Sequence, residues 1–315
     1  MHAKETKSSD APDSAVESRG AKAMLDLIHL SSLMDRSHGR PEIVVGLIDG
    51  PVAIDHPDLA AAMFREIPGK LNSRCLRRET PACAHATLVA GILIARRESV
   101  APAICPGCTL MLRPIFAETM DSSGQAPSST PDDLAEAIVE CVDGGVRVIN
   151  LSSALVQSSP KGERALNDAL QYAANRGVIS VAAAGNQGRV ASSAITRHAG
   201  VIPVTACSIR GTQLSMSNLG SSIGLRGLSA PGDNITSLGT DGKPRRFGGT
   251  SAAAPFVTGT IALLWSEFPS ASAAQIKLAL KQGGMPRRGA IAPPLLNAWA
   301  AYQMMASAHG RREMS

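Results

Sequence analysis

Five short runs of nearly uninterrupted apolar residues, rich in valine and isoleucine, constrain the fold of this chain more than any other feature. Each run has the length of a single strand, and none shows a regular alternation of apolar and polar residues. This pattern is typical of strands buried on both faces, as in a parallel sheet with helices on either side. The runs lie at residues 43–48, 109–115, 146–151, 178–183 and 201–206.

Helical patterns separate these runs and carry recognisable end signals. Thr130 and Pro131 are residue types favoured at the N-cap and the first position of a helix, and Gly177 is a natural C-cap. Ser272 begins a capping-box signature. The expected helices are 131–142, 163–175, 273–281 and 295–305. Strands that alternate with helices predict an α/β fold, a three-layer αβα arrangement with a mostly parallel central sheet.

The length of the chain predicts its domain organisation. With 315 residues, 44% of them hydrophobic, it can form one large domain with a full core. We expect this domain at residues 41–306, preceded by a short helical extension at 21–40. The polar residues 1–20 are expected to form a disordered tail, and residues 307–315 a flexible one.

Composition also bounds the location and the partners. The N-terminal residues lack the apolar region of a secretory signal, so we expect a cytoplasmic protein. The longest run of low polarity, 252–265, is too short to span a bilayer, and we expect no membrane association. The net charge of +5 is modest, and the arginine pairs lack interleaved aromatic residues. They predict a solvated basic surface and no nucleic-acid site.

The six cysteines allow two interpretations. Cys105 and Cys108 have the spacing of a redox or zinc half-site, and Cys75 with Cys83 could supply the other half. Because Cys105 and Cys108 precede a strand and do not open a helix, they do not fit the thioredoxin pattern. We expect structural thiols or a local disulfide, with a zinc site as the alternative.

Four polar residues stand at the ends of predicted elements. Asp49 ends the first strand, His85 opens an apolar helical run, Asn186 follows the fourth strand, and Ser251 precedes a helical run after two glycines. Functional groups of a parallel sheet gather beyond the carboxyl ends of its strands. Each residue alone would most simply be a cap or a turn residue. Together they supply a nucleophile, a base, an orienting carboxylate and an oxyanion donor, which are the groups for acyl transfer through serine.

These motifs resemble the subtilisin family of serine proteases, in which Asp, His and Ser follow one another in this order. The matching segments are 44–50, 56–59, 85–91, 148–152, 183–186 and 249–251, within a resemblance over residues 42–283. The resemblance implies that Ser251 is the nucleophile, His85 the general base and Asp49 its orienting carboxylate. It also implies an oxyanion hole formed by the Asn186 side chain and the Ser251 backbone N–H.

The same resemblance implies a serine endopeptidase that binds a peptide or protein as an added strand and forms an acyl-enzyme intermediate. The substrate-binding positions that match the family are Ser123, Gly124, Gln125, Leu151, Ser152, Ser153, Ala154, Ala183, Ala184 and Gly185. Ala154 stands where the family usually has glycine, and its methyl group narrows the entrance of the S1 pocket. We therefore expect small or medium-sized residues at the P1 position of the substrate.

One departure from the family pattern concerns metal binding. Asp58 matches a position that helps to bind calcium in many subtilisins. The calcium loop that normally interrupts the helix after His85 is replaced here by a segment containing Arg96 and Arg97. Two arginines disfavour a divalent cation, so we expect no cofactor, with a bound calcium ion as the alternative.

Finer features indicate a subgroup. Asp49-Gly50-Pro51, in place of the more usual Asp-Ser/Thr-Gly, resembles the subtilisin-like proteases that remove the leader from ribosomally made precursor peptides of the cyanobactin type. The short segment before the first strand favours an intracellular enzyme. The alternatives are a general intracellular turnover protease and a non-catalytic peptide-binding module. An esterase is disfavoured because Ala253 interrupts the Gly-x-Ser-x-Gly elbow.

Overall fold

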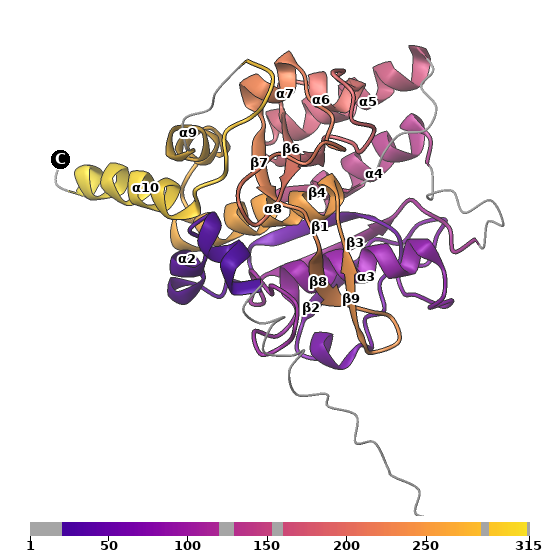
Figure 1. Ribbon diagram of the computed structural model, residues 1–315. Coiled ribbons are helices and arrows are strands. Elements are labelled where there is room, and N and C mark those ends of the chain that lie inside the picture. The colour runs from indigo at the N-terminus through magenta and orange to yellow at the C-terminus, as the bar shows by residue number, and fades with distance from the viewer. Residues whose placement is uncertain (1–20, 120–128, 153–159, 285–289, 314–315) are drawn as a thin grey trace, which may run out of the picture.

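The computed structural model describes residues 21–119, 129–152, 160–284 and 290–313 (Figure 1). At its centre lies a sheet of seven strands in the order β2-β3-β1-β4-β5-β6-β7, in which every neighbouring pair is parallel. The strands are β1 Val44–Asp49, β2 Met63–Glu66, β3 Thr109–Pro114, β4 Val148–Leu151, β5 Ile179–Ala183, β6 Val201–Cys207 and β7 Leu228–Pro231. A separate antiparallel hairpin of β8, Ile235–Leu238, and β9, Pro244–Phe247, follows β7.

Helices pack on both faces of the sheet (Figure 1). Helices α3 (Pro81–Ile94) and α8 (Thr250–Glu267) cover one face, and α4 (Pro131–Asp143) and α5 (Pro160–Asn175) cover the other. The remaining helices are α2 Ser31–Arg36, α6 Ala194–Arg197, α7 Ser221–Arg226, α9 Ala273–Gly283, α10 Ala298–Glu313 and the short 3-10 helix η1 Pro57–Leu59. This arrangement confirms the predicted three-layer αβα fold.

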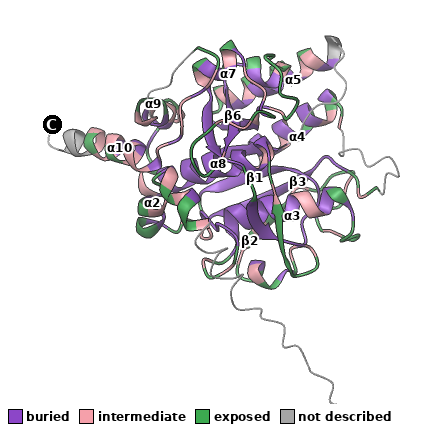
Figure 2. Ribbon diagram, in the orientation of Figure 1, coloured by how far each residue is buried: buried purple, intermediate pink, exposed green. Residues whose placement is uncertain are grey.

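The strands are buried on both faces, as their apolar runs predicted (Figure 2). In β1, Val45 and Leu47 belong to the core that contains α3 and α8, whereas Val44 and Ile48 belong to the core that contains α4 and α5. Helix α8 is buried around nearly its whole circumference, which explains why its sequence is apolar on every side. The mutual burial of α8 and the sheet fixes the start of α8 relative to the strand ends.

Two sheet strands and the hairpin were not expected from the sequence. Strand β2 is largely exposed, and its four residues include Arg65 and Glu66, so it lacks the pattern of a buried strand. Strand β7 is buried but reads Leu-Ser-Ala-Pro and contains no β-branched residue. Both lie at the edges of the sheet, where short strands are common.

The two ends of the chain differ in detail from the expected boundaries. Residues 21–27 are helical, but His29 has a φ of 50° and separates them from α2, so the N-terminal extension is two helical pieces. The guanidinium of Arg97 donates to the carbonyl oxygens of Met34 and Ser37 and ties this extension to the body. Helix α10 continues to Glu313, and therefore the domain boundary expected at residue 306 falls inside a helix. Residues 1–20 lie outside the described part of the chain.

The order of the sheet places two predicted site segments side by side. The chain adds β2 and β3 on one side of β1 and β4 to β7 on the other, so the order reverses between β1 and β4. Ile48 of β1 is paired with Leu151 of β4, which puts Asp49 next to the residues that follow β4. Ligands of open α/β sheets bind in the crevice at this kind of reversal.

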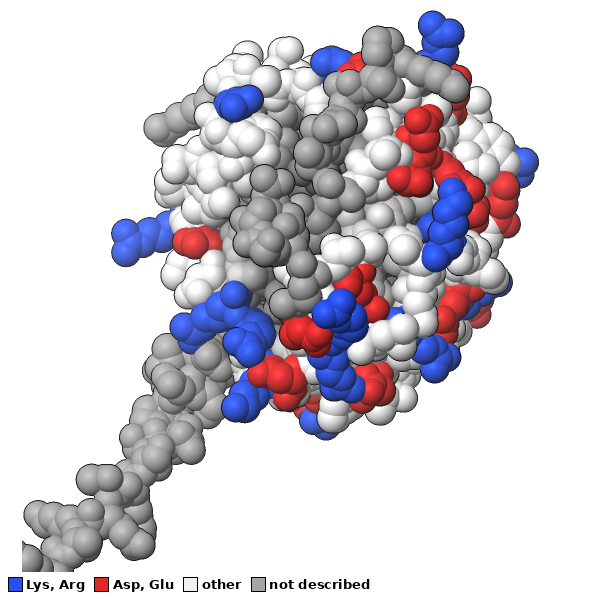
Figure 3. Space-filling view, turned by 90° about the vertical axis from the view of Figure 1, so that its right-hand side faces the viewer, with Lys and Arg blue, Asp and Glu red and all other residues white. Residues whose placement is uncertain are grey.

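The charge distribution and the helix lengths bear on possible partners. On the face shown in Figure 3, basic and acidic side chains are interspersed and form no continuous basic surface. Within the described ranges, no helix has both the length and the apolar character needed to cross a membrane.

Candidate active site

Asp49 and His85 form the most clearly defined contact of the site. Asp49 is the last residue of β1 and its side chain is fully buried, whereas the side chain of His85 on α3 is 29% exposed. One carboxylate oxygen of Asp49, Oδ1, lies 2.9 Å from His85 Nδ1 and also accepts a 2.8 Å hydrogen bond from the backbone of Gly50. This contact fixes the orientation of the imidazole and leaves its Nε2 for another partner.

The electrostatics of this pair affect the imidazole directly. Burial lowers the pKa of His85, but the negative charge of Asp49 and the hydrogen bond to it outweigh burial and bring the pKa above its usual value of 6.5. The ring of Phe247, at the end of β9, meets the His85 ring edge-on with 6.1 Å between the centroids. The hairpin of β8 and β9 therefore borders the imidazole on one side.

Gly50 explains how α3 can bring His85 so close to β1. A Cβ atom at position 50 would overlap the backbone carbonyl of Ala82 in the first turn of α3. Neither backbone can yield without moving the helix relative to the strand. Gly50 stands where the family more usually has serine or threonine. The close approach of β1 and α3 in this chain thus requires a residue without a Cβ atom at position 50.

We expect the Gly50→Ala variant to be destabilised by about 1–3 kcal/mol, because an overpacked site must displace the surrounding structure. The matched control is Gly69→Ala, whose added Cβ would meet its nearest neighbour at an ordinary 3.4 Å. Urea unfolding of both variants measures the effect. Equal stability of Gly50→Ala and the wild type would show that α3 does not approach β1 this closely.

Ser251 is the second residue of α8, and its backbone N–H belongs to the first helical turn, whose N–H groups have no intrahelical acceptor. Gly249 precedes the helix with a φ of 106°, a conformation that favours glycine. Within the described residues, no hydrogen bond joins the Ser251 hydroxyl to His85. Such bonds are often long without substrate.

The side chain of Asn186 is oriented by the residue before Ser251. Its Oδ1 accepts hydrogen bonds from the Thr250 backbone at 2.9 Å and from the Thr250 hydroxyl at 3.0 Å. A backbone N–H can only donate, so the atom facing Thr250 must be the amide oxygen. The amide nitrogen then lies beside Gly249, where an added Cβ would come within 2.8 Å of it. Asn186 therefore presents two N–H donors at the start of α8.

Two residues that support Asn186, Thr250 and Asn218, were not among the predicted site residues. The buried Thr250 hydroxyl accepts from the Gly185 backbone at 3.1 Å, and thus joins α8 to the loop that carries Asn186. Asn218 clamps the same loop: its Oδ1 accepts from the backbones of Gln187 and Arg189, and its Nδ2 donates to the carbonyl of Ala184. Thr250 could have been found from the Gly-Thr-Ser motif, but no sequence signal points to Asn218.

The structure places only some of the predicted substrate-binding residues. Leu151 ends β4, and Ser152 follows it and is almost fully buried. Ala183 ends β5, and the buried Ala184 and then Gly185, with a φ of 102°, lead to Asn186. The predicted positions Ser123, Gly124, Gln125, Ser153 and Ala154 lie outside the described residues.

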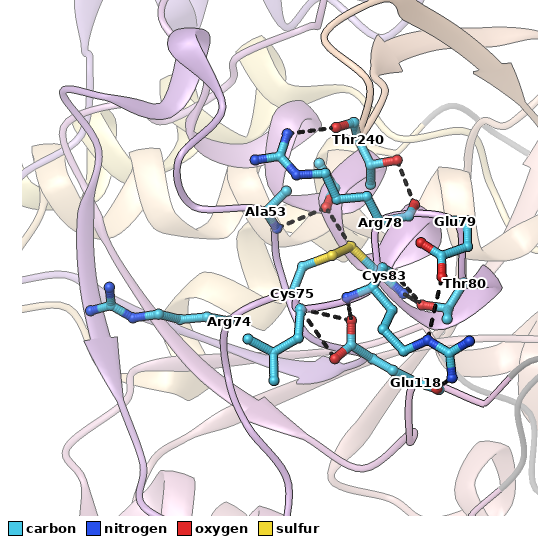
Figure 4. Close-up of a disulfide and its surroundings, with 12 residues drawn as sticks. Ala53, Arg74, Cys75, Arg78, Glu79, Thr80, Cys83, Glu118 and Thr240 are labelled. Atoms are coloured by element: carbon cyan, nitrogen blue, oxygen red, sulfur yellow. Dashed lines mark hydrogen bonds and ion pairs between the residues drawn. A yellow bond between two sulfur atoms is a disulfide. The ribbon is translucent and has the colours of Figure 1, made fainter.

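Two of the four cysteines considered for a zinc site form a disulfide instead. Cys75 and Cys83 are joined, and Cys83 is the third residue of α3, two residues before His85 (Figure 4). Glu118 is the other possible metal ligand nearby, but its carboxylate accepts backbone hydrogen bonds from Leu76 and Arg77. Cys105 and Cys108 are free, fully buried thiols outside this group. The local disulfide is confirmed, and the alternative of a four-cysteine zinc site is wrong.

A parallel αβα sheet brings an Asp–His pair to the carboxyl end of β1, and it holds an amide donor at the start of a helix that begins Thr-Ser. The Subtilase family, Peptidase S8, matches residues 40–284. The chain therefore belongs to the subtilase family.

Curated relatives agree with this assignment. The chain is 32% identical over 199 residues to a thermostable alkaline protease of Halalkalibacterium halodurans, and 32% identical over 231 residues to a thermophilic serine proteinase of Bacillus sp. strain AK1. These matches cover 63% and 71% of this chain, respectively. They span about half the length of the two relatives, 51% and 52%.

Solved structures of similar fold include two maturation proteases. A variant of the protease domain of PatA superposes with a TM-score of 0.77 at 29% identity, covering 86% of this chain and 97% of that domain. The prenylagaramide maturation protease PagA superposes with a TM-score of 0.76 at 26% identity, covering 88% of this chain and 98% of its own. The PatG macrocyclase domain, at 21% identity, shares the fold.

Proposed function

We propose that this protein is a serine endopeptidase that cleaves peptide bonds through an acyl-enzyme on Ser251. The observation that carries the proposal is the Asp49–His85 hydrogen bond at the same end of the sheet as the Asn186 amide and the start of α8. Subtilase membership of residues 40–284 supports the same chemistry. The substrate is a peptide or a protein.

In the proposed mechanism, each group has one role. His85, held at Nδ1 by Asp49, takes the Ser251 proton at Nε2 while Oγ attacks the substrate carbonyl. The negative charge that develops on the carbonyl oxygen is stabilised by the Asn186 amide and the Ser251 backbone N–H. His85 then gives its proton to the leaving amine, and water repeats the sequence to release the acyl group.

A random peptide library tests the activity and the expected specificity together. Mass spectrometry of the products should show cleavage after small or medium-sized residues by the wild type and none by Ser251→Ala. Peptides that bind but remain uncut by the wild type would favour the non-catalytic peptide-binding module. A strong preference for bulky aromatic residues at P1 would overturn the narrow S1 pocket expected from Ala154.

The Asn186→Ala variant is expected to lose about 10²–10³-fold in kcat with little change in KM, because its donors act on charge that appears only in the transition state. Thr250 provides a matched pair of variants. Thr250→Ser keeps the hydroxyl that holds Asn186 and should stay close to the wild type, whereas Thr250→Val should lose part of the activity. Steady-state kinetics in which Asn186→Ala changes only KM would contradict the assigned role.

We further propose that the physiological substrate is a ribosomally made precursor peptide from which the enzyme removes a leader. The likeness to PatA and PagA, over nearly the full length of their solved chains, supports this substrate class. A precursor peptide encoded beside this gene should be cut at one position between leader and core. Equally efficient cleavage of unfolded casein at many positions would favour general protein turnover instead.

Asp58 matches a position that helps to bind calcium in many subtilisins. Its carboxylate forms an ion pair with the guanidinium of Arg96, and the Arg96 backbone donates to the Asp58 carbonyl at 3.0 Å. We propose that Arg96 supplies the positive charge here in place of a metal. A chelator such as EDTA should therefore change neither the melting temperature nor the activity. A loss of stability restored by calcium but not by magnesium would contradict this proposal.

The cytoplasmic location stays a prediction, as does the absence of nucleic-acid and membrane partners. The chain contains the Cys75–Cys83 disulfide, and disulfides are more common in oxidising compartments than in the cytosol. Its redox state in the native host, measured by thiol trapping, tests the location. A fully reduced pair in cells would agree with the cytoplasm, and a fully oxidised pair would not.

A further inference from the structure

A small cavity lies at the amino ends of strands β6 and β7, at the end of the sheet away from the candidate active site. It has a volume of about 300 Å³ and is bordered by Val201 and Ile202 at the start of β6, Leu228 at the start of β7, and α9. Asp49 ends β1 in the same parallel sheet, so the cavity and the proposed catalytic groups lie at opposite strand ends. This volume is at the small end of the range of ligand pockets, roughly 300–1,000 Å³.

The polar residues of this cavity are all cations. Arg226, Lys277 and Lys281 line it together with apolar residues, and no carboxylate does among the residues that the structure describes. The two segments of the chain that form its walls contain no acidic residue over long stretches of sequence. The sequence contains no Asp or Glu between Asp168 and Asp233, and none between Glu267 and Glu313.

The charges of these cations are left uncompensated within the described residues. No ion pair there joins Arg226, Lys277 or Lys281 to a carboxylate, and the nearby Glu163 pairs with Arg197. The Nε of Arg226 is buried without a hydrogen-bond partner among the described residues, although its Nη2 donates to the carbonyls of Thr196 and Arg197. Burial, then Arg226 and Lys277, lower the pKa of His198, as expected where positive charge accumulates.

Helix ends explain two of these cations but not the third. Arg226 and Lys281 lie in the last turns of α7 and α9, where the helix dipole favours positive charge. Lys277 lies in the middle of α9 and four residues before Lys281, a spacing at which like charges repel. Burial lowers the pKa of Lys277, as expected for an ammonium that lacks a counter-charge. Lys277 thus has no evident role in the stability of the protein alone.

We propose that this cavity binds an aliphatic carboxylate, with its apolar chain against Val201, Leu228 and Leu280 and its charge on Lys277. The carboxylate supplies the negative charge that the walls lack, and the chain fills the apolar space. Two molecules share this chemistry: a free fatty acid of medium length, and a peptide that ends in an apolar residue with a free C-terminal carboxylate.

Binding of matched acids and amides by isothermal titration calorimetry tests the proposal. Octanoate represents the free acid and N-acetyl-leucyl-leucine the peptide terminus, each compared with its neutral amide. At least one acid should bind saturably and about tenfold more tightly than its amide, since a charge-assisted hydrogen bond is lost in the amide. Which acid does so identifies the source. Equal affinities of both acids and their amides, or no saturable binding, would overturn the proposal.

Two variants locate the bound charge. Lys277→Gln should weaken binding of the preferred acid about tenfold and leave its amide unaffected. Lys22→Gln, which removes an exposed lysine from the N-terminal extension, should change neither. Lys277→Gln should melt no lower than the wild type, because it also relieves the repulsion of Lys281. Unchanged acid binding by a folded Lys277→Gln protein would contradict the assignment. Binding is measured without turnover, so its failure leaves the proposed peptidase activity untouched.

Discussion

Replacement of Ser251 by alanine is expected to lower kcat about a millionfold, the scale known for a subtilisin nucleophile. Ser251 stands at the start of α8, and the other hydroxyl in the described first turn of this helix is that of the buried Thr250. Thr250 cannot substitute, because its hydroxyl is engaged by Asn186 and Gly185. The measurement is the rate of cleavage of a peptide found in the library experiment.

The control for this variant separates chemistry from folding. Ser32→Ala removes an exposed hydroxyl from α2 and should keep full activity. Ser251→Ala should melt close to the wild type and still bind peptide, since the change removes one partly exposed hydroxyl. A Ser251→Ala protein that retains more than about a hundredth of the wild-type rate has lost too little for a nucleophile, and the covalent mechanism would be rejected.

The Asp49→Asn variant is expected to lose about 10⁴-fold in kcat while it keeps the shape of the site. Asp49 Oδ1 holds His85 Nδ1, and an amide at this position can turn its NH₂ group toward that nitrogen. The imidazole would then carry its proton on Nε2, where it cannot accept the proton of Ser251. The loss should therefore appear in kcat more than in KM.

The same variant should move the acidic limb of the pH profile. A general base acts when neutral, so wild-type activity should rise with pH through the pKa of His85, which lies above 6.5 because of Asp49. Without the Asp49 charge, burial dominates and the pKa falls, so the limb should shift to lower pH. Asp35→Asn, at an exposed position of α2, should leave the limb in place. A limb unmoved in Asp49→Asn would exclude His85 as the group that titrates.

The buried core of this fold was predictable because its strands are marked by composition. The run that became β1 is apolar at every position before Asp49, since both of its faces are covered. Strand β2 is largely exposed, and β7, although buried, contains no β-branched residue. Neither strand has the composition of the other buried strands, so both were missed. The break at His29 depends on one backbone angle, which residue type alone does not determine.

The residues of the candidate site could be predicted from the sequence, but the contacts that hold Asn186 in place could not. Asp49 and His85 could be paired because a strand end and a helix start are the usual places for such groups. The orientation of Asn186 depends on Thr250, and the loop conformation depends on Asn218, which is distant in sequence. These contacts arise from tertiary packing, and a single sequence contains no periodic signal for them.

The pairing of the cysteines likewise could not be determined from the sequence alone. Two cysteines eight residues apart were compatible with a local disulfide or with half of a zinc site, and only the position of α3 relative to the preceding loop decides between them. The cavity beside Lys277 likewise has no local signature. The absence of acidic residues over two long stretches becomes meaningful only when the fold brings both stretches together.

Labelling with a fluorophosphonate probe, followed by mapping of the adduct by mass spectrometry, tests whether Ser251 is an activated nucleophile. The proposed mechanism predicts one adduct per chain, on Ser251, that is lost in His85→Ala and forms more slowly in Asn186→Ala. A folded wild-type protein that takes up no probe, or that carries the adduct on another residue while Ser251 stays unmodified, would contradict it.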